Sequence, residues 1–225
     1  MRLVVLTLLL LVYPRVCRDP VFFITPQPDG AADVLTFPAA FQGAYLQVRY
    51  DSTEVDSHLV MIHGGNLVCK SIYLITIPKD SLPGSDDARR SHDTLYWNNE
   101  DMVSFSTFSP RNDSFVVRSE LISTIFMPTD TSVLRFDEGV CFLNYHDRES
   151  GAFYVEVVFL QTDTLVHAAI DLRFEKNQLA QDFELNGDGP PFFVQPHRGW
   201  YSSYLKKGGF SSRDTFVRLA GSRKK

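Results

Sequence analysis

Stretches in which apolar and polar residues alternate with a period of two recur along most of this chain of 225 residues. In "HAAIDLRFEK", Ile170, Leu172 and Phe174 alternate with Asp171 and Arg173. Because successive side chains of a β-strand point to opposite faces of its sheet, this pattern predicts a half-buried strand. The same alternation runs through "AYLQVRY", "SIYLITIP", "DSFVVRSELISTIFMP" and "VCFLNY". The chain is therefore expected to be rich in strands.

The connections between these stretches favour antiparallel pairing. A short polar "QTDT" separates two apolar runs and predicts a hairpin over residues 153–174. The helical signal is confined to "NQLAQDFEL", which has room for about two turns at 3.6 residues per turn. The predicted fold class is all-β, with the strands arranged as an antiparallel β-sandwich.

An internal similarity bears on the number of domains. "LTFPAAFQGAYLQVRYD" and "LRFDEGVCFLNYHD" both begin with Leu-x-Phe, hold a central glycine (Gly43 and Gly139) and end near a tyrosine (Tyr50 and Tyr145). Their offset matches the length of one sandwich domain, about 100 residues. Residues 18–120 and 121–225 are therefore expected to be the halves of one sandwich or two tandem related domains, the second ending in a basic tail. The match needs gaps, so both arrangements stay open.

The N-terminus has the layout of a secretory signal peptide. Residues 1–17 contain the charged Arg2, an apolar run from Leu3 to Val12 and a break at Pro14. The run is shorter than the about 20 apolar residues that span a bilayer. The alternative is a hydrophobic first strand. We expect a secreted, extracellular protein that is not an integral membrane protein.

Export would place the cysteines in an oxidising compartment, where disulfides form and persist. With residues 1–17 removed, Cys69 and Cys141 remain, and a disulfide between them is predicted. The alternative is two buried thiols, because sequence spacing alone does not bring two sulfurs together.

The charge of the chain disfavours nucleic acid as a partner. Residues 1–17 hold two of the 22 Lys and Arg, so the remainder carries 20 basic and 27 acidic side chains, a net charge of −7. Proteins that bind the phosphate backbone present an excess of basic residues instead. The basic residues at the C-terminus are read as a solvated tail.

The tripeptide His63-Gly64-Gly65 resembles the oxyanion loop of some esterases. Those enzymes also need a Gly-x-Ser-x-Gly turn for the nucleophile, which this chain lacks. We interpret the tripeptide as the end of a strand followed by a glycine turn. The six histidines are scattered without the close spacing that presents two imidazoles to one ion, so neither a metal nor a cofactor is expected.

Two features bear on recognition. Asn112 begins an Asn-Asp-Ser glycosylation sequon in a polar turn. "RGWYSSYLKKGGF" gathers Arg198, Trp200, Tyr201 and Tyr204, residue types that contribute most of the energy at binding interfaces. These four are the candidate partner-binding residues. The alternative is a strand whose Trp200 fills the core.

The sequence therefore predicts a secreted, non-catalytic binding or effector protein that acts on an extracellular or cell-surface protein or glycan. Three other functions stay open. The first is a lectin-like carbohydrate-binding module that uses exposed aromatic side chains. The second is a structural surface protein, and the third and most remote is an esterase-like hydrolase that uses His63.

Overall fold

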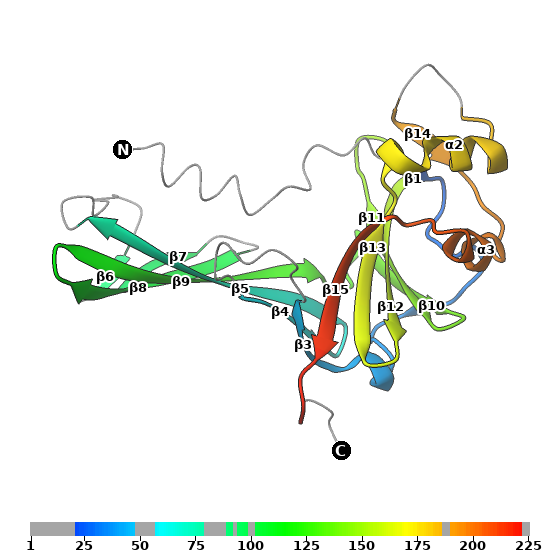
Figure 1. Ribbon diagram of the computed structural model, residues 1–225. Coiled ribbons are helices and arrows are strands. Elements are labelled where there is room, and N and C mark those ends of the chain that lie inside the picture. The colour runs from blue at the N-terminus through cyan, green and yellow to red at the C-terminus, as the bar shows by residue number, and fades with distance from the viewer. Residues whose placement is uncertain are drawn as a thin grey trace.

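A computed structural model of the protein describes residues 21–47, 57–78, 89–91, 94–98, 102–185 and 190–221. Residues 1–17, predicted to be a signal peptide, lie outside these ranges. The described chain forms one 15-stranded sheet with two α-helices, and every strand pair is antiparallel except β1 with β14. The predicted all-β class with antiparallel pairing is confirmed (Figure 1).

The strands follow one another across the sheet in an order that brings the two halves of the chain together. In that order they are β2 (Asp33–Val34), β10 (Ser132–Asp137), β11 (Val140–His146), β12 (Phe153–Gln161), β13 (Thr164–Ala169), β15 (Ser212–Arg218), β3 (Gly43–Gln47), β4 (Ser57–His63), β5 (Asn66–Pro78), β9 (Ser114–Phe126), β8 (Met102–Arg111), β7 (Thr94–Asn98) and β6 (Arg89–Ser91). A side branch consists of β1 (Val21–Phe23), which pairs with β12, and β14 (Phe192–Val194), which pairs with β1.

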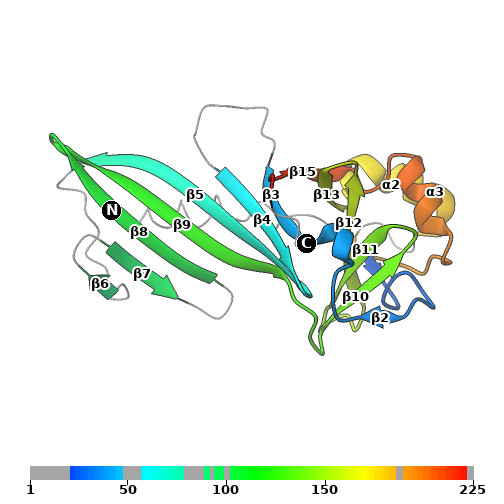
Figure 2. The ribbon, with the colours of Figure 1, turned by 90° about the horizontal axis from the view of Figure 1, so that it is seen from below.

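The sheet curls, and two hydrophobic cores lie on its two faces. The strands β10 to β13, β15 and β3 to β5, together with β9, enclose the second core, in which the two sides of the curled sheet pack on each other as sandwich layers (Figure 2). The first core lies on the opposite face of β11 to β13, under α2 (Leu172–Asp182), α3 (Trp200–Lys206), β1 and β14. On β12, Val155 and Val157 belong to the first core and Val158 belongs to the second, as the period of two requires.

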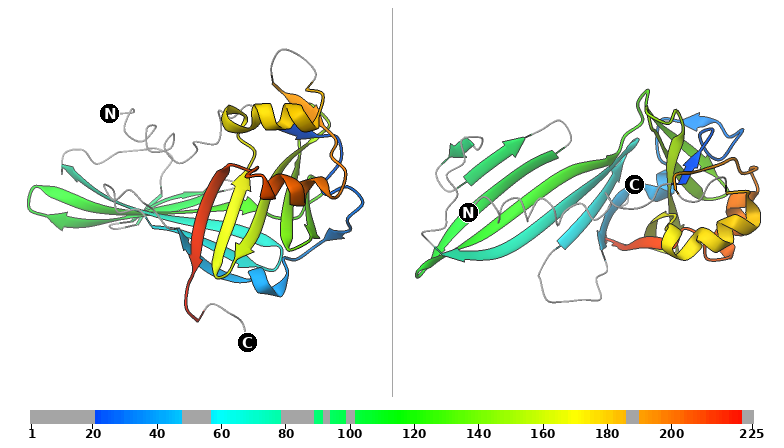
Figure 3. Two further views of the ribbon diagram at one scale, coloured as in Figure 1. Left: turned by 45° about the vertical axis from the view of Figure 1, so that its right-hand side comes forward. Right: turned by 90° about the horizontal axis from the view of Figure 1, so that it is seen from above.

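Beyond this body, part of the sheet continues as an arm formed by β5, β9 and β8, with β7 and β6 along one edge (Figures 1 and 3). The strands β5 and β9 are 13 residues each and pair over nearly their full length. At about 3.3 Å per residue, such a strand spans about 40 Å. Residues 120 and 121, where the two predicted halves meet, lie within β9, so a boundary there would cut a strand. The number of domains stays a prediction.

The predicted hairpin over residues 153–174 is present as β12 and β13, but it ends at Ala169. The prediction of a strand through Leu172 and Phe174 is wrong, because α2 begins at Leu172. The Asp171 carboxylate accepts a hydrogen bond from the Arg173 backbone N–H and caps the helix. Buried residues on α2 are Leu172, Glu175 and Leu179, which recur with the helical period, while Phe174 is exposed.

Candidate functional site

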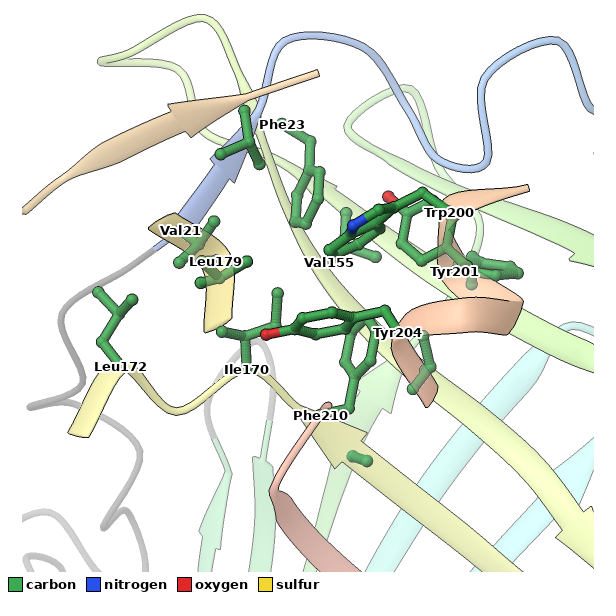
Figure 4. Close-up of a cluster of buried hydrophobic side chains, with 14 of the residues drawn as sticks. Val21, Phe23, Val155, Ile170, Leu172, Leu179, Trp200, Tyr201, Tyr204 and Phe210 are labelled. Atoms are coloured by element: carbon green, nitrogen blue, oxygen red, sulfur yellow. The ribbon is translucent and has the colours of Figure 1, made fainter. Parts of the chain in front are cut away.

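The aromatic residues predicted to contact a partner lie inside the protein. Trp200, Tyr201 and Tyr204 are on α3 and retain exposed fractions of 6%, 2% and 0%. The Trp200 ring stacks on Tyr204 with centroids 4.2 Å apart, and its Nε1–H donates a hydrogen bond to Asp182 (2.8 Å). The expectation that these rings are exposed is wrong, because α3 packs them into the first core (Figure 4). The alternative of a strand with Trp200 in the core is correct about Trp200 and wrong about the strand.

Arg198, the fourth predicted partner-binding residue, is exposed and forms an ion pair within the chain. Its guanidinium donates two hydrogen bonds to Asp137, at 2.7 and 3.1 Å. The hydrogen bonds and positive charge of Arg198 lower the pKa of the Asp137 carboxyl. This pair connects the segment before α3 to the end of β10, which gives Arg198 a structural role.

The predicted disulfide between Cys69 and Cys141 is not formed, and both are free thiols. Cys69 lies on β5 and Cys141 on β11, with five other strands between these two in the sheet order. Cys141 is fully buried in the second core, and this burial raises its thiol pKa to about 12. The alternative of two buried thiols is right that both are unpaired, but only Cys141 is buried, because Cys69 is half-buried.

The sequon and the glycine tripeptide both occupy hairpin turns. Asn112 is exposed in the turn between β8 and β9, at the far end of the arm, with a positive φ of 46°; its glycosylation stays a prediction. His63 ends β4, and Gly64 and Gly65 form the turn into β5, as predicted. The Gly64 N–H donates to the Gln42 side chain (2.9 Å). An added Cβ on Gly65 would lie 2.3 Å from the Leu35 carbonyl oxygen, so this turn needs glycine for close backbone approach.

A line of side chains crosses six neighbouring strands on one face of the sheet, which we call the outer face. It is the face on which the first core lies over β11 to β13. The registers place Val217 beside Leu46, Leu46 beside Leu59, and Leu59 beside Lys70. The line continues from Lys70 to Ile122 and from Ile122 to Val103. We call this line the outer row. Its residues are Val217, Leu46, Leu59, Lys70, Ile122 and Val103.

Five of the six side chains of the outer row are apolar, and they are exposed or half-buried. Val217, Leu46 and Val103 keep exposed fractions of 45%, 40% and 43%, and Leu59 and Ile122 are half-buried. None of the five belongs to either hydrophobic core. The helices α2 and α3 cover the outer face over β11 to β13, and no described helix covers it from β15 to β8. Contiguous exposed apolar surface of this kind marks interaction sites on soluble proteins.

A small group of charges interrupts the apolar surface. Lys70 and Arg118 both form ion pairs with the Glu120 carboxylate, and Arg118 Nη1 lies 2.6 Å from Glu120 Oε1. Glu120 is nearly buried between the two cations, whereas Arg118 is half exposed. Two positive charges against one negative leave the surface beside the outer row locally positive on a chain with a net charge of −5.

The sequence held a signal for the outer row that the alternation pattern alone did not reveal. Leu59 precedes Val60, Tyr45 precedes Leu46, and Leu121 precedes Ile122, so three of these strands carry apolar residues on both faces. One member of each pair fills the interior side and the other faces outward. Strands that are apolar on both faces are expected to be covered on both sides.

Two further properties hold for the described part of the chain. The helices there are too short and too polar to cross a membrane. The same residues contain no cluster of three or more His, Cys, Asp or Glu that could hold a metal ion.

Comparison with known proteins found no matching family model, no matching curated protein and no matching solved structure.

Proposed function

We propose that the protein is a secreted, non-catalytic binding protein that engages an extracellular or cell-surface partner protein through the outer row and the adjoining arm. The observation that carries this proposal is the register-aligned apolar row on a face that no described helix covers. The layout of residues 1–17 supports the extracellular location.

The dimensions of the surface suit a protein partner. Six strands about 4.8 Å apart make the outer row about 24 Å wide, and the strands β5 and β9, which run from the body into the arm, span about 40 Å. A standard protein interface buries about 800 Å² on each partner, which such a surface can supply. Leu74, further along β5, is also exposed and extends the apolar surface onto the arm.

The charges beside the row indicate the chemistry of the partner. Lys70 and Arg118 share a single carboxylate, so a partner that contributes an acidic side chain next to an apolar patch would complete the pairing. Such complementarity mainly raises the association rate and selects the register of docking. The proposed partner therefore presents apolar side chains with at least one carboxylate.

The test is capture from an extracellular and cell-surface extract, read by mass spectrometry, with variants of the outer row. Leu46→Glu and Val103→Glu place charge on two exposed positions of the row. Leu35→Glu is the matched control, because Leu35 is the most exposed large apolar residue described and lies outside the row. A protein retained by the native chain and by Leu35→Glu but lost with both row variants supports the proposal. Equal retention by all four chains contradicts it.

A further inference from the structure

A second group of aromatic side chains lies in register on the opposite face of the sheet, at the side branch. Phe22 on β1 pairs with Phe193 on β14 and with Tyr154 on β12. Tyr154 pairs in turn with Tyr145 on β11. We call this line the aromatic row. Its residues are Phe193, Phe22, Tyr154 and Tyr145, one from each of four neighbouring strands.

The rings of the aromatic row form two contacting pairs, and Tyr145 at one end also packs against Phe126 of the second core. The Phe22 and Phe193 rings stack with centroids 5.6 Å apart and an angle of 23° between their planes. The Tyr145 and Tyr154 centroids are 6.2 Å apart. Phe193 keeps an exposed fraction of 44%, and the other three side chains are half-buried.

The first core does not account for Phe22 and Phe193. Their neighbours Val21, Phe23 and Phe192 point to the other face of the branch and fill the first core. Because side chains alternate along a strand, Phe22 and Phe193 point away from that core, and neither belongs to either core cluster. A branch that served only to cover the core would be expected to carry polar residues on its outward side.

Polar groups adjoin the aromatic row on one side. The single proton of the Tyr145 hydroxyl faces the Ile125 carbonyl oxygen at 3.1 Å and the Glu156 carboxylate at 3.3 Å, and the Tyr154 hydroxyl donates to Glu156 at 3.5 Å. Glu156 also lies 2.7 Å from Nε2 of His167, and both of these side chains are buried. The Ile125 carbonyl and the buried carboxylate thus hold the two phenol groups, whose oxygens can still accept a hydrogen bond from a ligand hydroxyl.

This combination fits a neutral, hydroxyl-rich ring. The electron-rich faces of aromatic rings attract the polarised C–H groups on the face of a sugar, while phenol groups form hydrogen bonds with sugar hydroxyls. The row itself carries no Lys or Arg that would attract an anionic ligand. We propose that the aromatic row is a binding site for a neutral oligosaccharide, with sugar rings stacked on Phe193 and Phe22. This site is separate from the outer row and does not depend on the partner proposed above.

The test is binding of the full chain to an array of neutral glucose, mannose and N-acetylglucosamine oligomers, with sialylated and sulfated oligosaccharides on the same slide. We expect a neutral oligomer to bind the native chain. We expect Phe193→Ala to weaken this binding at least tenfold and Tyr154→Phe, which removes only a hydroxyl, to weaken it severalfold. Phe174→Ala is the matched control, because Phe174 is an exposed phenylalanine on α2 outside the row.

Three outcomes overturn the proposal: no oligosaccharide binds, only anionic ones bind, or Phe193→Ala binds as the native chain does. Leu46→Glu separates the two sites. It is expected to bind the oligosaccharide normally whether or not the outer row docks a protein. Circular dichroism of each variant verifies that it is folded, and Tyr154→Phe provides a test that does not alter packing volume.

Discussion

The Glu175 carboxylate joins three separate segments and is the most informative position for a stability test. It is buried and accepts hydrogen bonds from the backbone N–H groups of Asp171 (2.8 Å), Phe210 (2.8 Å) and Ser211 (2.7 Å). It also accepts from the hydroxyls of Ser211 and Tyr204, both at 2.6 Å. One side chain thus holds the start of α2, the middle of α3 and the chain entering β15 in place.

Glu175→Gln keeps the shape of the side chain and replaces one acceptor oxygen with a donor group. That NH₂ would face one or two backbone N–H donors, so at least one buried N–H is left without an acceptor, while a hydroxyl on the same side must turn to accept. Hydrogen bonds to a charged group contribute about 1.5–3 kcal/mol each. Removing the charge also removes its desolvation cost, which offsets part of the loss. We expect the free energy of unfolding to fall by about 3 kcal/mol, a large part of the about 5–15 kcal/mol typical of a folded domain.

The assay is urea unfolding followed by far-ultraviolet circular dichroism, with midpoint and slope fitted for each chain. Glu184→Gln is the matched control, because Glu184 is exposed just beyond the end of α2. The control should change the unfolding free energy by less than about 0.5 kcal/mol. If Glu175→Gln changes it by no more than the control does, the carboxylate does not hold the three segments together and the reasoning is refuted.

Three further predictions concern single groups. No described residue offers the buried Tyr201 hydroxyl a hydrogen bond, so Tyr201→Phe should leave the melting temperature unchanged or raise it, and a clear fall would contradict this. Arg198 lowers the pKa of Asp137 below its ordinary value of 3.8. The ion pair therefore stabilises the fold above pH 3.8, and this stabilisation is lost as the pH falls through the lowered pKa. Unfolding measured at several pH values should show that Asp137→Asn removes the part of the acid destabilisation that this pair causes. Burial raises the Cys141 pKa to about 12, so iodoacetamide at pH 8 should label Cys69 first in peptide mapping, and equal labelling would refute the assignment.

The strand-rich class was predictable because the alternation depends on neighbouring residues in the sequence. The change from strand to helix after Ala169 was not predicted, since Leu172 and Phe174 continue the period of two. The contacts that stabilise the helix here come from residues distant in sequence, because Glu175 accepts hydrogen bonds from backbone groups more than 30 residues further along the chain. A local signal did exist, because Asp171 is a favourable N-cap residue.

The wrong prediction that three aromatic residues are exposed for binding has a similar explanation. Trp200, Tyr201 and Tyr204 are types common at interfaces and also common in cores, so composition alone could not choose between them. Their spacing of one and four positions places them on one side of a helix, and the packing of α3 on the sheet then buries them. The outer row and the aromatic row were not predicted, because each depends on strand pairs that meet only in the folded sheet, such as β15 with β3 and β1 with β14.

The regular pairing of β5 with β9 from Val68 to Pro78 determines how the length of the arm can change during evolution. Within this stretch, an insertion of one residue that is not absorbed by a bulge, as the register shift between Leu67 and Val68 is, would turn every later side chain to the opposite face. Lengthening β5, β8 and β9 by two residues each preserves both faces and moves the tip outward by about 7 Å. Relatives of this protein should therefore differ in arm length by even steps, with the Asn112 turn carried outward as an unchanged cap.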